Sequence, residues 1–88
     1  MIIYIGNLPA DIYEEELIEM FQEYGAVKSV KIIKDRYSKK SRGYAFVKMD
    51  DKDAALKAIE EWDEGSIDDQ IIKVQEARYT KGRSKRNR

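Results

Sequence analysis

The chain contains no cysteine and no histidine among its 88 residues. Without cysteine it can form neither a disulfide framework nor a thiolate metal site. Without histidine it lacks the commonest general base and the commonest transition-metal ligand of proteins, which weighs against an enzyme. The sequence therefore indicates no catalytic centre, no metal and no cofactor.

Long apolar runs are also absent. No stretch approaches the roughly 18 residues that a membrane-spanning helix needs, and residues 1–8 lack the basic start and long apolar body of a signal peptide. The length is enough for one small domain with a single core. We therefore expect one domain in a reducing, aqueous compartment, with no membrane association.

The net charge of zero hides a strong segregation of charge along the chain. Residues 11–23 carry six acids and no base, residues 28–48 carry eight bases against one acid, and residues 50–64 carry seven acids against two bases. Residues 78–88 hold six bases and no acid, so residues 1–77, with 11 bases and 17 acids, sum to −6. The protein can still present a basic surface if the acidic segments fold to its opposite side.

The periodicity of apolar residues predicts the first half of the fold. Residues 2–8 alternate as a strand, with Tyr4 and Gly6 on the face opposite Ile3. A helix follows from a cap at Tyr13, with the apolar residues Tyr13, Leu17, Phe21 and Tyr24 on one face and Gly25 as its C-terminal glycine. Asp11 with Glu14 is a rival capping pair for the same helix. Residues 27–34 then form a second strand.

The second half repeats this order. Residues 35–41 form a basic connection, expected to be a flexible arm, and residues 42–49 form a third strand. Asp50 or Asp51 caps a second helix, which places Ala55, Leu56, Ala58, Ile59 and Trp62 at helical spacing. Trp62 is predicted to be core or a lid over the core. An acidic loop over residues 63–69 leads to a last strand over residues 70–77, with Ile72 and Val74 inward.

The order strand, helix, strand, strand, helix, strand predicts an α+β fold, a ferredoxin-like βαββαβ sandwich. Its four-stranded antiparallel sheet carries both helices on one face, and right-handed crossovers place the first and third strands in the middle. On residues 42–49 alone, Tyr44 and Phe46 could equally pack under a covering layer. The topology instead leaves them on an open face with Tyr4, and an exposed aromatic patch of this kind needs a partner.

Two motifs on these central strands give the chain a family resemblance. Residues 42–49 read Arg-Gly-Tyr-Ala-Phe-Val-Lys-Met and meet the longer signature of the RNA recognition motif at every position except the last. Residues 3–8 read Ile-Tyr-Ile-Gly-Asn-Leu and match the shorter signature. The chain therefore resembles an RNA recognition motif domain over residues 1–78, followed by a disordered basic tail over residues 79–88.

The resemblance implies single-stranded RNA, and possibly single-stranded DNA, as the partner. It implies that Tyr4 and Tyr44 each stack under a base, that Phe46 packs between sugars, and that Arg42 pairs with a phosphate. It also implies that Gln75 and Glu76 touch base edges. The full set of expected RNA-binding residues is Tyr4, Tyr44, Phe46, Arg42, Lys48, Lys31, Gln75, Glu76, Arg78 and Lys40.

Three positions depart from the family pattern. Met49 replaces an aromatic residue but is expected on the core face, where it affects packing and not binding. Lys39 stands where the loop often has glycine, and residues 63–69 lack the usual Asn-Gly pair. The turn types of these two connections are therefore not fixed by the sequence.

Two other functions compete with RNA binding. An RRM-like protein-protein interaction module would receive a peptide on the aromatic face or on the acidic helices. A ferredoxin-like enzyme of the acylphosphatase kind would need an anion-cradling loop, which residues 9–11 do not offer. The chain is also similar to the small single-domain RNA-binding proteins of bacteria, which implies a cytoplasmic monomer.

Overall fold

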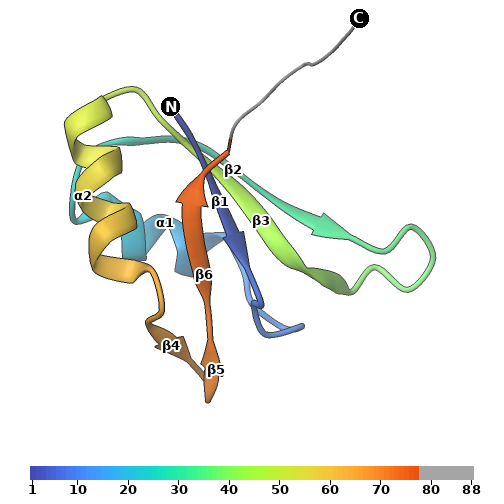
Figure 1. Cartoon of the computed structure of the whole chain (residues 1–88). Helices are drawn as coiled ribbons and strands as arrows, with labels where there is room; N and C mark the ends of the chain where they lie inside the picture. The colour runs from blue at the N-terminus through green and yellow to red at the C-terminus, as the bar shows by residue number, and fades with distance from the viewer. Residues whose placement is uncertain (78–88) are drawn as a thin grey trace, which may run out of the picture.

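The computed structural model describes residues 1–77 and contains two helices and six strands in that range (Figure 1). The elements are β1 (Ile2–Gly6), α1 (Glu14–Gln22), β2 (Val27–Lys34), β3 (Ser41–Met49), α2 (Lys52–Trp62), β4 (Ser66–Ile67), β5 (Gln70–Ile71) and β6 (Lys73–Glu76). In this part of the chain, no helix has both the length and the apolar character required to cross a membrane.

The main sheet has four antiparallel strands in the order β2-β3-β1-β6. Both helices lie on the same side of this sheet in Figure 1. Strand order and layers confirm the predicted ferredoxin-like sandwich, with β1 and β3 in the centre. The opposite face of the sheet has no covering layer within the described residues.

The core lies between the sheet and the helices. Alternate residues of the central strands point into it. The buried face of α2 carries small side chains, which let that helix approach the sheet closely. The core residues with no exposed surface are Ile3, Ile5, Leu17, Phe21, Ala45, Val47, Met49, Ala55 and Ala58. Met49 is thus a packing residue, as expected. Ile72 and Val74 are also buried, as predicted, whereas Leu56 is 44% exposed, so its assignment to the apolar face of α2 was wrong.

The helix starts are fixed by carboxylates. The Tyr13 N–H donates to Glu16 Oε1 at 2.9 Å at the start of α1, and Asp51 Oδ1 accepts from the Ala54 N–H at 3.1 Å at the start of α2. These contacts favour Tyr13 over Asp11 and Asp51 over Asp50 as the caps. The Tyr13 side chain makes no cap hydrogen bond and is 68% exposed, so its placement on the apolar face of the helix was wrong.

Gly25 is needed for close packing and not for ending α1. The helix ends at Gln22, and the only glycine with positive φ among residues 1–77 is Gly43. A Cβ added to Gly25 would lie 2.7 Å from the Ala54 Cβ on α2. The expected C-terminal glycine is therefore a contact point between the chain after α1 and the start of α2.

A small hairpin precedes the last strand. β4 pairs with β5 in antiparallel register, and the two residues between them, Asp68 and Asp69, have φ values of 48° and 72°. Two consecutive positive φ values are typical of a type I′ turn, which usually takes Asn-Gly. Aspartate also tolerates this conformation, so the hairpin forms without that pair. The predictions of a plain acidic loop and one unbroken last strand were both wrong.

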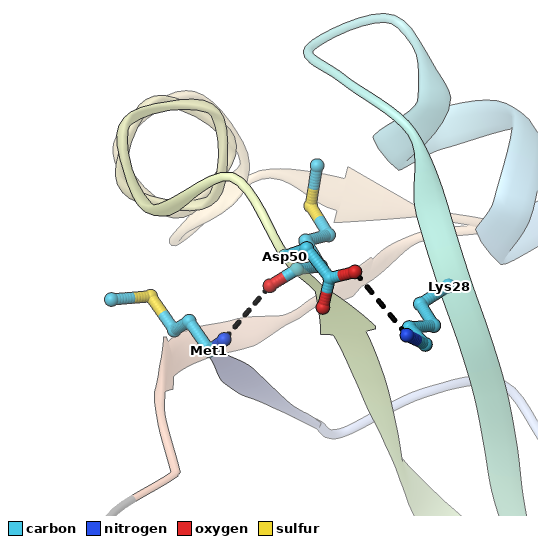
Figure 2. A network of polar contacts seen from close by, with 4 residues as sticks. Met1, Lys28 and Asp50 are labelled. Carbon is cyan, nitrogen blue, oxygen red and sulfur yellow. Dashed lines mark hydrogen bonds and ion pairs between the residues drawn. The ribbon is translucent and has the colours of Figure 1, made fainter.

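Polar contacts tie β1 to β3 at the end where β1 begins. The Met1 amino group donates to the Met49 carbonyl at 2.8 Å (Figure 2). The Met49 N–H donates to the Met1 carbonyl at 3.0 Å. Lys28 and Asp50 form a 3.4 Å ion pair beside them, the one salt bridge found within residues 1–77. Because both of its side chains are largely exposed, this pair contributes little to stability.

The Gly25 contact gives a stability prediction. Gly25→Ala should lower the free energy of unfolding by about 1–3 kcal/mol, because the new methyl group overpacks the Ala54 contact. Chemical denaturation measures the change. In an Ala54→Gly background the same substitution should cost clearly less, because the opposing methyl group is gone. Equal costs in the two backgrounds would contradict the packing role of Gly25.

Candidate nucleic-acid interface

A row of side chains crosses the whole open face of the sheet. The register pairs Lys31 of β2 with Phe46 of β3, Phe46 with Tyr4 of β1, and Tyr4 with Gln75 of β6. Paired residues of antiparallel strands share one face. Because Ile3 and Val47, their neighbours along β1 and β3, are buried against the helices, this row faces away from the core.

Two further rows flank it. On one side Tyr44 pairs with Gly6, which pairs with Lys73. On the other side Lys48 pairs with Ser29 and Ile2. The open face therefore carries Tyr4, Tyr44 and Phe46 at its centre, as predicted. Lys31, Lys48 and Lys73 lie around them.

The three rings form a compact cluster. Their centroids lie 6.1 Å apart for Tyr4 and Tyr44, 5.9 Å for Tyr4 and Phe46, and 6.2 Å for Tyr44 and Phe46. Tyr4 and Tyr44 are tilted by 35°, whereas Phe46 stands at 88° to Tyr44. Such distances allow attractive edge and offset contacts, so the rings support one another's positions while remaining partly exposed.

Gly6 makes room for the Tyr4 ring. A Cβ at Gly6 would lie 2.5 Å from the Tyr4 hydroxyl and 3.0 Å from two ring carbons. The Tyr4 side chain therefore lies along the strand over Gly6, and this close approach explains the glycine. The Tyr4 ring thus fills the space that a side chain at position 6 would take.

The charges on the two sides of the sheet differ. On the open face Lys31, Lys48 and Lys73 are exposed and have no salt bridge within residues 1–77. The acidic residues of α1 and α2 lie on the helix side, behind the sheet. The segregation of charge along the sequence thus becomes a segregation between two faces, and the aromatic face is the cationic one.

A hollow of about 350 Å³ opens at the edge of the aromatic cluster. It is lined by Tyr4, Phe46, Gln75, Glu76 and Ala77. Gln75 lies in the central row, so its amide is available there. Glu76 pairs with Ile3, so the register directs its side chain to the helix side and leaves its main chain beside the hollow.

Two of the remaining predicted residues, Lys40 and Arg42, lie outside the three paired rows. Lys40 lies in the turn between β2 and β3, and Arg42 lies near the start of β3, where Gly43 has a φ of 93°. Arg78 lies outside the described residues, as do residues 79–88. Lys73 was not among the predicted site residues, although its alternation with Ile72 and Val74 already predicted that it faces outward. The register places it opposite Gly6.

The connection between β2 and β3, expected to be a flexible arm, forms a hydrogen-bonded turn. Asp35 Oδ1 accepts from the Tyr37 and Ser38 N–H groups at 2.8 and 2.9 Å. The Lys39 N–H donates to the Asp35 carbonyl at 3.0 Å, and Lys39 takes the left-handed conformation, with a φ of 67°, at the position where glycine is usual. One carboxylate thus organises a turn rich in cations.

The same contacts affect the titration of Asp35. The Ser38 and Tyr37 N–H groups hold the pKa of the Asp35 carboxyl below its ordinary value, and the Arg42 charge lowers it further. The Arg42 charge therefore acts on the carboxyl that organises the turn. A carboxyl with a depressed folded-state pKa stabilises the turn above its unfolded pKa, and this contribution is lost as the pH falls through the folded pKa.

We predict that the ¹³C resonance of the Asp35 carboxyl titrates below pH 3.9, the ordinary value for aspartate. The amide resonances of Tyr37 and Ser38 should shift with the same midpoint, because protonation weakens their hydrogen bonds. In Asp35→Asn the amide oxygen can still accept these bonds, so the shared acid transition should vanish while the turn persists. A midpoint at or above the ordinary value would contradict this role of Asp35.

Comparisons with known proteins agree with this geometry. Residues 3–73 match the family model of the RNA recognition motif. The chain is 49% identical over 59 residues to heterogeneous nuclear ribonucleoprotein Q of Arabidopsis thaliana, a match that covers 67% of this chain and 12% of that protein.

Two solved structures have the same fold. The crystal structure of RNA binding protein PG1 superimposes with a TM-score of 0.86 at 41% identity, covering 91% of this chain and 96% of that one. A structure titled as an Sxl-lethal protein/RNA complex gives a TM-score of 0.85 at 26% identity, covering 90% of this chain and 47% of that one.

The chain spans 12% to 33% of the length of five curated relatives that it matches. The shared part is the RNA recognition motif. Because the family match covers residues 3–73 and the structure has the matching sheet order and aromatic face, this chain belongs to the RNA recognition motif family.

Proposed function

We propose that this domain binds single-stranded RNA on the open face of its sheet and catalyses no reaction. The observation that carries the proposal is the central row, in which Tyr4 and Phe46 lie between Lys31 and Gln75 with no covering layer in the described part of the chain. Bases of single-stranded RNA are free to stack on aromatic rings, whereas bases inside a duplex are not.

The ring geometry supports different roles for the three aromatic residues. Tyr4 and Tyr44 lie closer to parallel, so each can offer a ring face to one of two successive bases. Phe46 stands nearly perpendicular to Tyr44, which suits a contact with sugars between those bases. These are the roles that the family resemblance implies.

Polar groups around the rings complete the proposed site. Lys31 and Lys48 flank Phe46 across and along the strands, where they can meet phosphates, and Lys73 adds a third cation beside Gly6. Gln75 borders the hollow next to Tyr4, where its amide can donate to and accept from a base edge. The Glu76 main chain can do the same.

The expected affinity is moderate. Each stacked base contributes about 1–3 kcal/mol, so two stacks and a few phosphate contacts suggest a dissociation constant of roughly micromolar order. Cations around the rings favour RNA over a peptide on this face, since a peptide groove would need neither rings nor cations. The cytoplasmic location, the monomeric state and the role of the basic residues after position 77 stay predictions.

Two substitutions test the stacking proposal. Tyr44→Ala and Phe46→Ala should each weaken binding to short RNAs of mixed sequence by about tenfold or more, because each removes a ring that contacts the strand. Fluorescence anisotropy measures the affinity, and circular dichroism confirms that each variant is folded.

Leu56→Ala is the matched control, because it removes an exposed apolar side chain from α2 on the other side of the sheet. It should leave the affinity unchanged. Wild-type affinity in a folded Tyr44→Ala or Phe46→Ala variant, or an equal loss in Leu56→Ala, would rule out stacking on this face.

A further inference from the structure

A second hollow, of about 370 Å³, lies beyond the start of β3. It is formed where the segment before α1 meets the turn between β2 and β3. A hydrogen bond of 2.9 Å from the Leu8 N–H to the Gly43 carbonyl holds the two segments together nearby. Ser41, the first residue of β3, lines this hollow, so it lies where the sheet ends and the hollow begins.

Tyr13 lines this hollow with a ring that the fold does not use. Its side chain is 68% exposed, packs outside the core, and makes no hydrogen bond at the start of α1, where the Glu16 carboxylate binds the backbone instead. Tyrosine is also a poor capping residue. Neither helix capping nor core packing therefore accounts for an aromatic residue at this position.

The walls of the hollow are cationic. Lys34, Lys39 and Lys40 line it together with one acid, Asp11, and none of the three lysines has a salt bridge within residues 1–77. The backbone of Lys39 is left-handed, a conformation that glycine adopts with less strain. A charged residue nevertheless stands at this position. An exposed ring beside unpaired cations has the same composition as the open face of the sheet, and it fits a base with its phosphate.

We propose that this hollow binds a further nucleotide of the same RNA strand, outside the sheet. The base stacks on Tyr13, the phosphates approach Lys34, Lys39 and Lys40, and the Asp11 carboxylate can accept a hydrogen bond from a base amino group. The proposal rests on the RNA binding proposed above. A strand that leaves Tyr44 and passes Arg42 reaches Ser41 at the rim of the hollow, so the site extends the path across the sheet.

RNAs of different length distinguish binding at this hollow from binding on the sheet. The sheet aromatics of the fold stack two or three bases, so an RNA of about four nucleotides fills the sheet, whereas one of about eight can also reach Tyr13. Tyr13→Leu keeps apolar bulk but removes the ring, and it should weaken binding of the longer RNA about fivefold or more while leaving the shorter RNA unchanged. Binding of both RNAs to the full chain is followed by titration of amide shifts and by anisotropy.

Tyr37→Leu is the matched control. Tyr37 lies in the turn between β2 and β3 and is 86% exposed, but it does not line the hollow. Its loss should therefore weaken the binding of neither RNA. The proposal is overturned if Tyr13→Leu leaves the longer RNA unaffected, weakens both lengths equally, or has no more effect than Tyr37→Leu. Tyr44→Leu should weaken both lengths, and its failure to do so would instead overturn the proposed function of the sheet.

Discussion

The antiparallel pairing of β1 with β3 is the constraint on which the rest of the structure depends. It sets Tyr4 opposite Phe46 and Gly6 opposite Tyr44, and a shift of one residue would turn the rings of one strand into the core. The same register buries Ile3, Ile5 and Val47 without exposed surface. The hydrophobic core therefore holds the aromatic cluster in place, although the cluster lies on the other face of the sheet.

The placement of charge follows from this layering. The helices cover one face of the sheet and carry most of their acids on their exposed sides, while Lys31, Lys48 and Lys73 lie on the other face. A chain whose total charge is zero can thus present a cationic surface to a polyanion. Removing the helical acids would change the net charge but not the composition of the aromatic face.

The sequence was sufficient to predict the order of the two helices and the four strands of the main sheet, the central position of β1 and β3, and the open face with Tyr4, Tyr44 and Phe46, because alternation and topology together determine them. Features that depend on close contacts could not be read from it. Gly25 faces Ala54, a contact visible only once the chain after α1 packs on α2. The turn organised by Asp35 depends on side chain to backbone hydrogen bonds, which have no periodic signal.

The central claim is that RNA bases stack on the open face of the sheet. It is tested most directly by nuclear Overhauser effects between a bound RNA of about four nucleotides and the protein side chains. The proposed function predicts contacts from base protons to the rings of Tyr4 and Tyr44, and from ribose protons to Phe46. If RNA binds but shows contacts only to residues of α1 or α2 and none to the three rings, the account is contradicted.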